Sequence, residues 1–134
     1  MNTTQNRAVI IAYVDAFNRG NVDEVCRLFS ADAAIFGVLG RGGLDKAIPI
    51  WEQLVRCFKI NFRVEAMVAE GDTVAVRFIE RGTFSSPFRD IPPTGKSYEV
   101  IAMEWFVLRD GKITQRWGAR DSAAIFGQMG VPLS

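Results

Sequence analysis

Four long segments in the second half of the chain read as β-strands, at residues 62–68, 73–84, 98–108 and 111–121. In the first segment the residues Phe62, Val64, Ala66 and Val68 alternate with less apolar ones, and successive side chains of a strand point to opposite faces. Turn signals separate consecutive segments, and Asp110-Gly111 is a strong hairpin signal. The sequence therefore predicts a meander of long antiparallel strands.

Helical patterns occupy most of the first half of the chain. One begins at a cap at Thr3 or Thr4 and runs to about Arg19, a second follows a cap at Asn21, and a third covers residues 44–58. Residues 33–36 read as a short strand, and residues 37–43 as a glycine-rich turn without the Lys-Ser/Thr ending of a phosphate-binding loop. Helices on one side of an antiparallel sheet predict an α+β fold.

Composition limits the kind of protein this can be. The chain has 134 residues, 49% of them hydrophobic, with ten Phe and three Trp, which suits one domain over residues 1–134 with an apolar cavity in its core. Sixteen basic residues against fifteen acidic ones give a net charge of +1, so we expect no binding to nucleic acid or to an anionic membrane. There is no histidine, so acid–base chemistry must use Asp, Glu, Tyr, Lys or Arg-assisted water.

The chain also has no targeting or metal-binding signal. Its longest apolar runs, at residues 8–13 and 100–103, are far shorter than the ~20 residues of a membrane span. The polar start at residues 1–6 does not read as a signal peptide, so a cytoplasmic protein is expected. Cys26 and Cys57 are read as small core residues, with neither a disulfide nor a thiol metal site.

Asp121 is the first candidate for chemistry. Read with period two, it ends an otherwise largely apolar row of the last strand, which includes Ile113, Gln115, Trp117 and Ala119. The opposite row is polar and basic, so the row with Asp121 is expected to face inward, where a carboxylate is costly to desolvate. The alternative is that Asp121 caps the helix that begins at Ser122.

Three further polar residues have open interpretations. Both faces of the strand that begins at Thr73 carry charges, so Arg81 either meets Asp121 in the interior or pairs across strands in solvent. Glu104 lies in a strand that is apolar on both faces, and forms either a structural ion pair, a dimer contact or part of the site. Tyr13 is either a core aromatic or a hydroxyl donor in the cavity.

Several motifs together resemble the SnoaL-like polyketide and ester cyclase family, which belongs to the superfamily similar to nuclear transport factor 2. They are Gly82-Thr83-Phe84, Ile91-Pro92-Pro93-Thr94-Gly95, Asp110-Gly111-Lys112-Ile113, Trp117-Gly118-Ala119-Arg120-Asp121 and Gln128-Met129-Gly130-Val131-Pro132, with Tyr13 to Asp23 and Leu28 to Ala33 at the front. The resemblance implies a cystatin-like, cone-shaped roll in which a strongly curved antiparallel sheet wraps the N-terminal helices around a deep apolar cavity. It also implies a homodimer through the outer sheet face.

The resemblance implies different residue roles for different relatives. For the polyketide cyclases, the acid–base carboxylate falls on Asp121. For the related limonene epoxide hydrolases, the catalytic charges fall on Arg81 and Asp121, but Thr83 replaces the middle Asp, and Ile35 and Gly37 replace the groups that hold water. For ketosteroid isomerase, Tyr13 matches, but the base falls on about Gly37 and the oxyanion-hole acid on Met103. These departures disfavour the last two activities.

The resulting hypothesis is an acid–base enzyme of the cyclase or isomerase type without cofactor or metal, acting on a small hydrophobic carbonyl compound. Asp121 would transfer the proton, while Tyr13 or Arg81 would donate to the substrate oxygen. The side chains expected to shape the pocket are Phe17, Trp51, Phe58, Met103 and Trp117. The alternatives are a binding module without catalysis, or an accessory subunit whose exposed sheet face pairs with a partner.

Overall fold

The computed structural model describes residues 2–37 and 40–131. Its helices are α1 (Thr3–Asn18), α2 (Val22–Arg27), α3 (Leu44–Phe58) and α4 (Ser122–Met129). Its strands are β1 (Phe29–Gly37), β2 (Gly40–Gly42), β3 (Asn61–Glu70), β4 (Thr73–Thr83), β5 (Ser97–Arg109) and β6 (Lys112–Arg120). The predicted helices and long strands are therefore all present.

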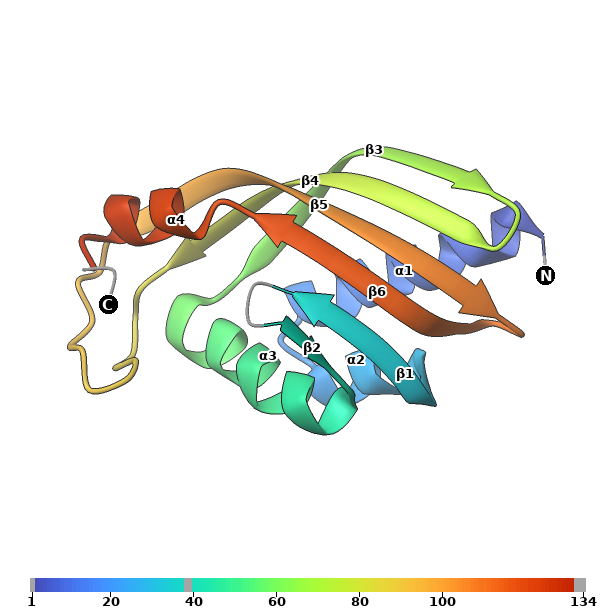
Figure 1. The fold of residues 1–134 in the computed structure, drawn as a ribbon. Coiled ribbons are helices and arrows are strands. Elements are labelled where there is room, and N and C mark those ends of the chain that lie inside the picture. The colour runs from blue at the N-terminus through green and yellow to red at the C-terminus, as the bar shows by residue number, and fades with distance from the viewer. Residues whose placement is uncertain (1, 38–39, 132–134) are drawn as a thin grey trace.

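The six strands form one sheet in the order β2-β1-β6-β5-β4-β3. Figure 1 shows this sheet as a strongly curved layer with α1, α2 and α3 on one side, while α4 lies at one end, against β5. The predicted α+β fold is confirmed. The predicted meander corresponds to β3 through β6, which pair antiparallel, whereas β1 adds to β6 in parallel.

Local sequence explains where the helices begin. Asn2, rather than Thr3 or Thr4, caps α1: its side chain accepts from the Gln5 backbone N–H at 2.8 Å, and the Gln5 side chain accepts from the Asn2 N–H. Asn21 caps α2 as predicted, accepting from the Glu24 N–H at 3.1 Å. None of the helices within residues 2–37 and 40–131 is both long and apolar enough to cross a membrane.

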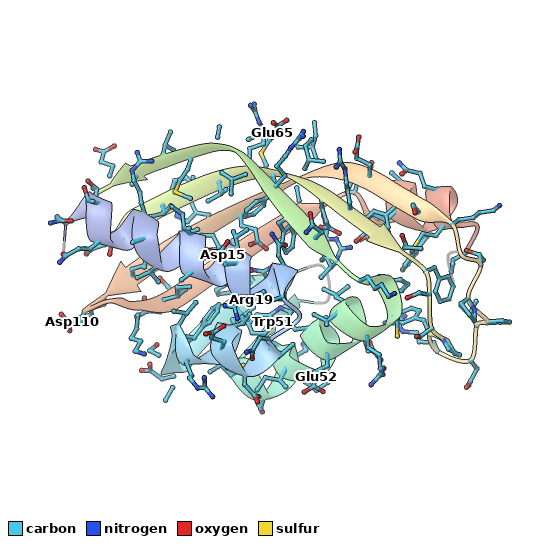
Figure 2. The ribbon with its side chains drawn as sticks, turned by 180° about the vertical axis from the view of Figure 1, so that it is seen from behind. Asp15, Arg19, Trp51, Glu52, Glu65 and Asp110 are labelled. Atoms are coloured by element: carbon cyan, nitrogen blue, oxygen red, sulfur yellow. The ribbon has the colours of Figure 1, made fainter. Side chains whose placement is uncertain are left out.

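The buried side chains form two clusters. The larger lies between the first three helices and the sheet; Figure 2 labels two neighbours on α3, of which Trp51 is buried in this cluster and Glu52 is exposed. The smaller cluster lies under α4 and includes Phe58, Phe84, Phe88, Ile125 and Met129. Phe58 therefore packs with the loop before β5 rather than in the larger cluster.

A β-bulge in β6 reverses the face that its residues present. Ile113 pairs with Leu108 and Gln115 pairs with Val107, so Thr114 is an extra residue that is opposite no residue of β5 in the strand register. Beyond the bulge, the side chains of Arg116 and Arg120 point toward the helices and Gly118 lines the same cavity, while Trp117 is partly exposed. The prediction that Gln115, Trp117, Ala119 and Asp121 share the inward face with Ile113 is wrong, because one extra residue moves every later side chain to the opposite face.

The neighbouring strands keep regular alternation and bury two carboxylates. In β4 the row Val74, Val76, Phe78, Glu80 and Gly82 is buried, and in β5 the row from Tyr98 to Leu108 that includes Glu104 is buried. Glu80 and Glu104 are 1% and 7% exposed. The opposite rows, with Arg81 and Met103, face away from the helices.

Candidate active site

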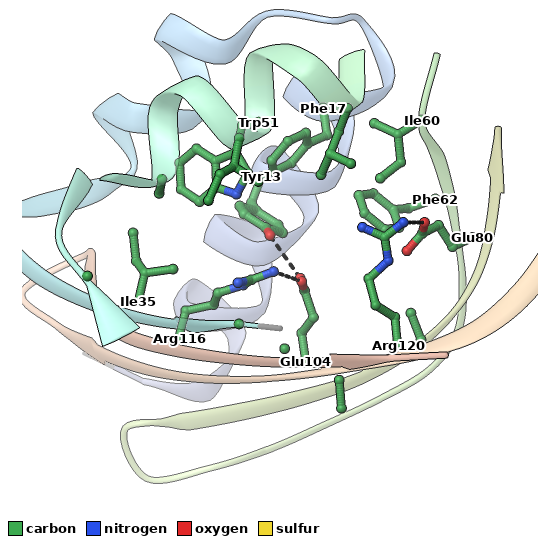
Figure 3. Close-up of a pocket in the computed structure, with 18 of the residues that line it drawn as sticks. Tyr13, Phe17, Ile35, Trp51, Ile60, Phe62, Glu80, Glu104, Arg116 and Arg120 are labelled. Atoms are coloured by element: carbon green, nitrogen blue, oxygen red, sulfur yellow. Dashed lines mark hydrogen bonds and ion pairs between the residues drawn. The ribbon is translucent and has the colours of Figure 1, made fainter. Parts of the chain in front are cut away.

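A cavity of about 80 Å³ lies between the inner face of the sheet and the helices α1 and α3. Its apolar wall comes mainly from Tyr13, Phe17, Trp51, Ile60 and Phe62. Its polar wall consists of four charged side chains from the sheet, drawn in Figure 3: Glu80, Glu104, Arg116 and Arg120. Lys46 of α3 also lines it, with glycines of β1 and β2.

The first polar network joins Tyr13, Glu104 and Arg116 (Figure 3). The Tyr13 hydroxyl donates to Glu104 Oε1 at 2.8 Å, and Arg116 Nη2 contacts Glu104 Oε2. The side chains of Arg116 and Glu104 are only 13% and 5% exposed, so this ion pair is buried. Both carboxylate oxygens of Glu104 are therefore occupied.

The second network has the same composition and joins Tyr98, Glu80 and Arg120. The Tyr98 hydroxyl donates to Glu80 Oε2 at 2.6 Å, and Arg120 Nη2 lies 2.6 Å from the same oxygen. Both interactions meet at Oε2, so Oε1 of Glu80 accepts no hydrogen bond from the residues that the structure describes. The two networks thus differ in how fully the carboxylate is used.

Burial controls the protonation of these groups. Desolvation raises the pKa of Glu80, although the Arg120 charge and the Tyr98 hydrogen bond act in the opposite direction. Desolvation and then the Glu104 charge raise the pKa of Tyr13 well above its usual value, and burial and the Glu80 charge likewise raise that of Tyr98. Both hydroxyls are therefore donors at neutral pH. Burial opposes the charge of Arg116, but Glu104 outweighs it and keeps the pKa of Arg116 raised.

The two guanidinium groups have donors left over. Each carries five N–H groups, and each ion pair uses a single nitrogen, Nη2. The Nε atoms of Arg116 and Arg120 are buried and have no hydrogen-bond partner among the described residues. The cavity therefore has a surplus of hydrogen-bond donors, which suits a ligand with oxygen acceptors. Among the described residues no group of three His, Cys, Asp or Glu side chains could hold a metal ion.

Asp121 and Arg81 are not where the sequence hypothesis needs them. Asp121 is exposed and caps α4, its carboxylate accepting from the Ala124 N–H at 2.9 Å, which is the alternative interpretation given above. Arg81 is exposed on the outer face, where its Nε lies 2.5 Å from Glu99 Oε1. Neither residue lines the cavity, and they do not meet. A catalytic role for Asp121 stays a prediction, without the buried setting that motivated it.

Of the six residues predicted to bind substrate, Tyr13, Phe17 and Trp51 line the cavity. Met103 and Trp117 do not, because strand alternation and the bulge turn them to the outer face, where they are 56% and 37% exposed. Trp117 stacks on Phe36 there, with ring centroids 5.1 Å apart. Phe58 is buried in the cluster under α4 and does not line the cavity.

Sequence reasoning missed three of the four cavity charges. Glu104 was identified, because a charge among apolar residues on both sides is visible in sequence. The sequence pattern leaves the face of Glu80 open, because both faces of its strand carry charges, and it predicts the outer face for Arg116 and Arg120. One available signal is that Arg116 and Arg120 share one row of the last strand, and acids buried in a neighbouring strand need basic partners.

The comparison with protein families decides the relationship. A model of the SnoaL-like polyketide cyclases matches residues 7–129, which is most of the chain. The chain belongs to the SnoaL-like polyketide cyclase family. The family predicted from the sequence motifs is thereby confirmed.

Solved structures share the fold of this chain. IdmH, a candidate polyketide cyclase from Streptomyces antibioticus, has a TM-score of 0.82 and 28% identity, over 95% of this chain and 99% of that chain. AclR, a candidate hydroxylase from Streptomyces galilaeus, has a TM-score of 0.88 and 21% identity, over 98% of this chain and 100% of that chain. A candidate polyketide cyclase from Xanthomonas campestris pv. campestris has a TM-score of 0.87 and 21% identity, over 96% of this chain and 99% of that chain. Among curated proteins no match is found. These solved structures thus share the fold of this chain at 21–28% identity.

Proposed function

We propose that the protein is a cofactor-independent acid–base enzyme of the cyclase or isomerase type, with Glu80 as the proton-transfer group. The substrate is a small, largely apolar compound with a carbonyl group. The observation that supports this role is that Glu80 is buried, has a raised pKa and uses only Oε2 for its two partners. A carboxyl group with a pKa lifted toward neutrality is suited to accept and return a proton.

The proposed step is proton abstraction next to the carbonyl group. The C–H bond of the substrate breaks, its proton goes to Glu80 Oε1, and the electron pair moves onto the carbonyl oxygen to give an enolate. That oxygen is stabilised by N–H groups of Arg116 and Arg120 that are not used by Glu104 and Glu80. Both guanidinium groups remain charged throughout the step. Glu80 then returns the proton to another carbon of the substrate. In ring closure, the enolate carbon instead attacks a second carbonyl carbon of the substrate, the electron pair of that C=O bond moves onto its oxygen, and this oxygen takes the proton from Glu80.

The size of the cavity supports a small substrate. Its volume of about 80 Å³ is below the ~300–1,000 Å³ of typical ligand pockets. The aromatic wall of Phe17, Trp51 and Phe62 would bind the apolar part of the substrate by burial. A larger substrate requires the side chains at the cavity to move.

The test compares Glu80→Gln with Asp121→Asn, assayed on a panel of small cyclic and linear ketones by proton exchange into deuterated water. Glu80→Gln is expected to lower exchange by about 10²–10⁴-fold, because Gln cannot take a proton, while Asp121→Asn stays within a few-fold. The reverse result would assign proton transfer to Asp121. Equal loss in both variants, or none, would contradict Glu80.

A second candidate, a small-molecule-binding module without catalysis, is favoured by one observation: both cavity carboxylates are paired with arginines. A binding module would keep its affinity for a ketone in Glu80→Gln and return it unchanged, with no deuterium incorporated. Calorimetry and mass spectrometry of the same sample separate the two functions.

We further propose that the protein is a homodimer through the outer face of the sheet. This face carries an apolar patch of large exposed side chains: Val68, Ile101, Met103, Trp105 and Trp117. Charges of both signs lie on the same strands, in the pairs Arg63–Glu65 and Arg81–Glu99. In a two-fold interface the same surface contacts itself and must be self-complementary. An apolar centre can pack against its own copy, and surrounding charges of both signs can pair across the interface.

A further inference from the structure

Gly118 lies in the sheet wall of the cavity, between Arg116 and Arg120 on β6 and opposite Glu104 on β5. The guanidinium of Arg116 rests against it. A Cβ atom added at position 118 would stand 2.8 Å from Arg116 Nη2, 3.0 Å from Cζ and 3.3 Å from Nη1. Non-bonded heavy atoms in proteins essentially never lie within 3.0 Å of a Cβ atom. The guanidinium therefore occupies space that any other residue at this position would need.

A second glycine borders the same guanidinium. Gly37 follows Phe36, which pairs with Trp117, so Gly37 and Gly118 are neighbours across β1 and β6. A Cβ atom at position 37 would lie 3.6 Å from Arg116 Nη1, which is an ordinary contact. Arg116 thus lies flat over two strands that carry no side chain at these points, and only position 118 is too close for a methyl group.

We propose that Gly118 is a positioning residue: its missing side chain lets Arg116 lie across β6 and reach Glu104. The network of Tyr13, Glu104 and Arg116 exists only because this space is empty. An effect of Gly118 on turnover would rest on the proposed function. The effect of Gly118 on the position of Arg116 does not, because that position can be measured without a substrate.

A methyl group at position 118 would displace Arg116 rather than the backbone. All three contacts are with the end of a flexible side chain, which can swing away. That movement leaves Glu104 buried without its counter-charge, and breaking a buried ion pair from one side is strongly destabilising. Alanine is otherwise a better strand residue than glycine, so backbone propensity alone would stabilise the variant.

Gly82 lies against Tyr98, a member of the second network, as Gly118 lies against Arg116, but a substitution at Gly82 would be a poorer test. A Cβ atom there would lie 2.4 Å from Tyr98 Cε1 and 2.6 Å from the backbone oxygen of Phe58. The second contact is with backbone, which cannot swing away, so a variant at this position would disturb the fold itself. Gly118 is therefore the position to change.

The experiment is a double-mutant cycle by thermal unfolding, with Gly118→Ala, Arg116→Met and the double variant. Gly118→Ala is expected to lower Tm by about 5–10 °C, whereas in the Arg116→Met background the same change costs less than about 2 °C. Gly127→Ala is the matched control, because a Cβ atom there meets nothing within 4 Å and its Tm should not fall. Equal losses in both backgrounds would overturn the proposal.

NMR supplies a second readout that needs only the single variant. The Nη–H signals of Arg116 should be separate in the wild type, because the ion pair slows rotation of the guanidinium, and should merge in Gly118→Ala. Unchanged signals in Gly118→Ala would overturn the proposal even if Tm falls. If instead Glu80→Gln retains full activity while the coupling between positions 116 and 118 is present, the proposed function fails and this inference holds.

Discussion

At the scale of single residues, the site depends on two buried acids whose partners come from distant parts of the chain. Tyr13 and Glu104 are 91 residues apart in sequence, yet their side chains meet at 2.8 Å. Glu80 has partners of the same two kinds, Tyr98 and Arg120, but its one unused oxygen separates its chemistry from that of Glu104. Two acids in one cavity can therefore have different roles because their hydrogen bonds differ.

Glu80 should make stability depend on pH in a predictable direction. In the unfolded chain its pKa is about 4.3, and burial raises the pKa in the folded protein. Between these two values the folded state binds more protons, so the contribution of Glu80 to the free energy of unfolding falls as pH rises. Above the folded pKa the loss is complete and constant.

The measurement is urea unfolding of the wild type and Glu80→Gln from pH 4 to pH 8. The wild type is expected to lose stability relative to the variant by about 1.4 kcal/mol for each pH unit inside the window. Other carboxylates cancel in this difference because both proteins contain them. A difference that stays constant, or that rises with pH, would show that burial does not raise the pKa of Glu80.

At the scale of elements, two local features near the ends of β6, a β-bulge and a helix cap, determine which side chains reach the cavity. The bulge at Thr114 turns Arg116 and Arg120 inward, and Asp121 stops the strand by capping α4. The cap also turns the Asp121 carboxylate toward the backbone of Ala124 and away from the cavity. The carboxylate that best fits the sequence pattern of the family is thus used for helix initiation in this structure.

Replacing Asp121 separates a capping role from a catalytic one. Asp121→Ala is expected to lower the free energy of unfolding by about 1 kcal/mol, because the Ala124 N–H loses its acceptor, while Asp121→Asn should have little effect, since Asn caps equally well. Chemical denaturation of both variants checks this. Equal stability of all three proteins would mean that the cap contributes nothing.

At the scale of the whole molecule, the curved sheet has two faces with different tasks. The concave face holds the cavity and its charges, whereas the outer face carries the apolar patch around Met103 and Trp105. Glu65, labelled in Figure 2, points away from the sheet on this outer side. A patch of this kind on one side of a sheet is a typical interaction surface.

Met103→Lys should convert the proposed dimer into a monomer, because a buried unpaired ammonium group is costly at an interface. Sedimentation velocity of the wild type should give twice the mass of the chain, and that of the variant the mass of one chain. Ile11→Lys is the control, since Ile11 is 51% exposed but lies on α1, away from the sheet face. A wild type that sediments as one chain would remove the dimer proposal.

The sequence alone determined the elements and the fold class. Helix caps such as Asn21, turns such as Asp110-Gly111 and the period of apolar residues are local signals, and local signals are sufficient to place helices and long strands. The family motifs are also read directly from sequence, and they were enough to identify the SnoaL-like family. The apolar wall residues Tyr13, Phe17 and Trp51 were found in this way too.

Only the tertiary structure decided which charges line the cavity. Strand period cannot reveal the bulge at Thr114, because a bulge is defined by pairing with another strand, and one extra residue exchanges the faces of Arg116 and Trp117. Nor can it decide that Glu80 is buried, because a buried acid is tolerated only when partners such as Tyr98 and Arg120 are brought to it from other strands. The fold follows from local order along the chain, whereas the site follows from contacts between strands.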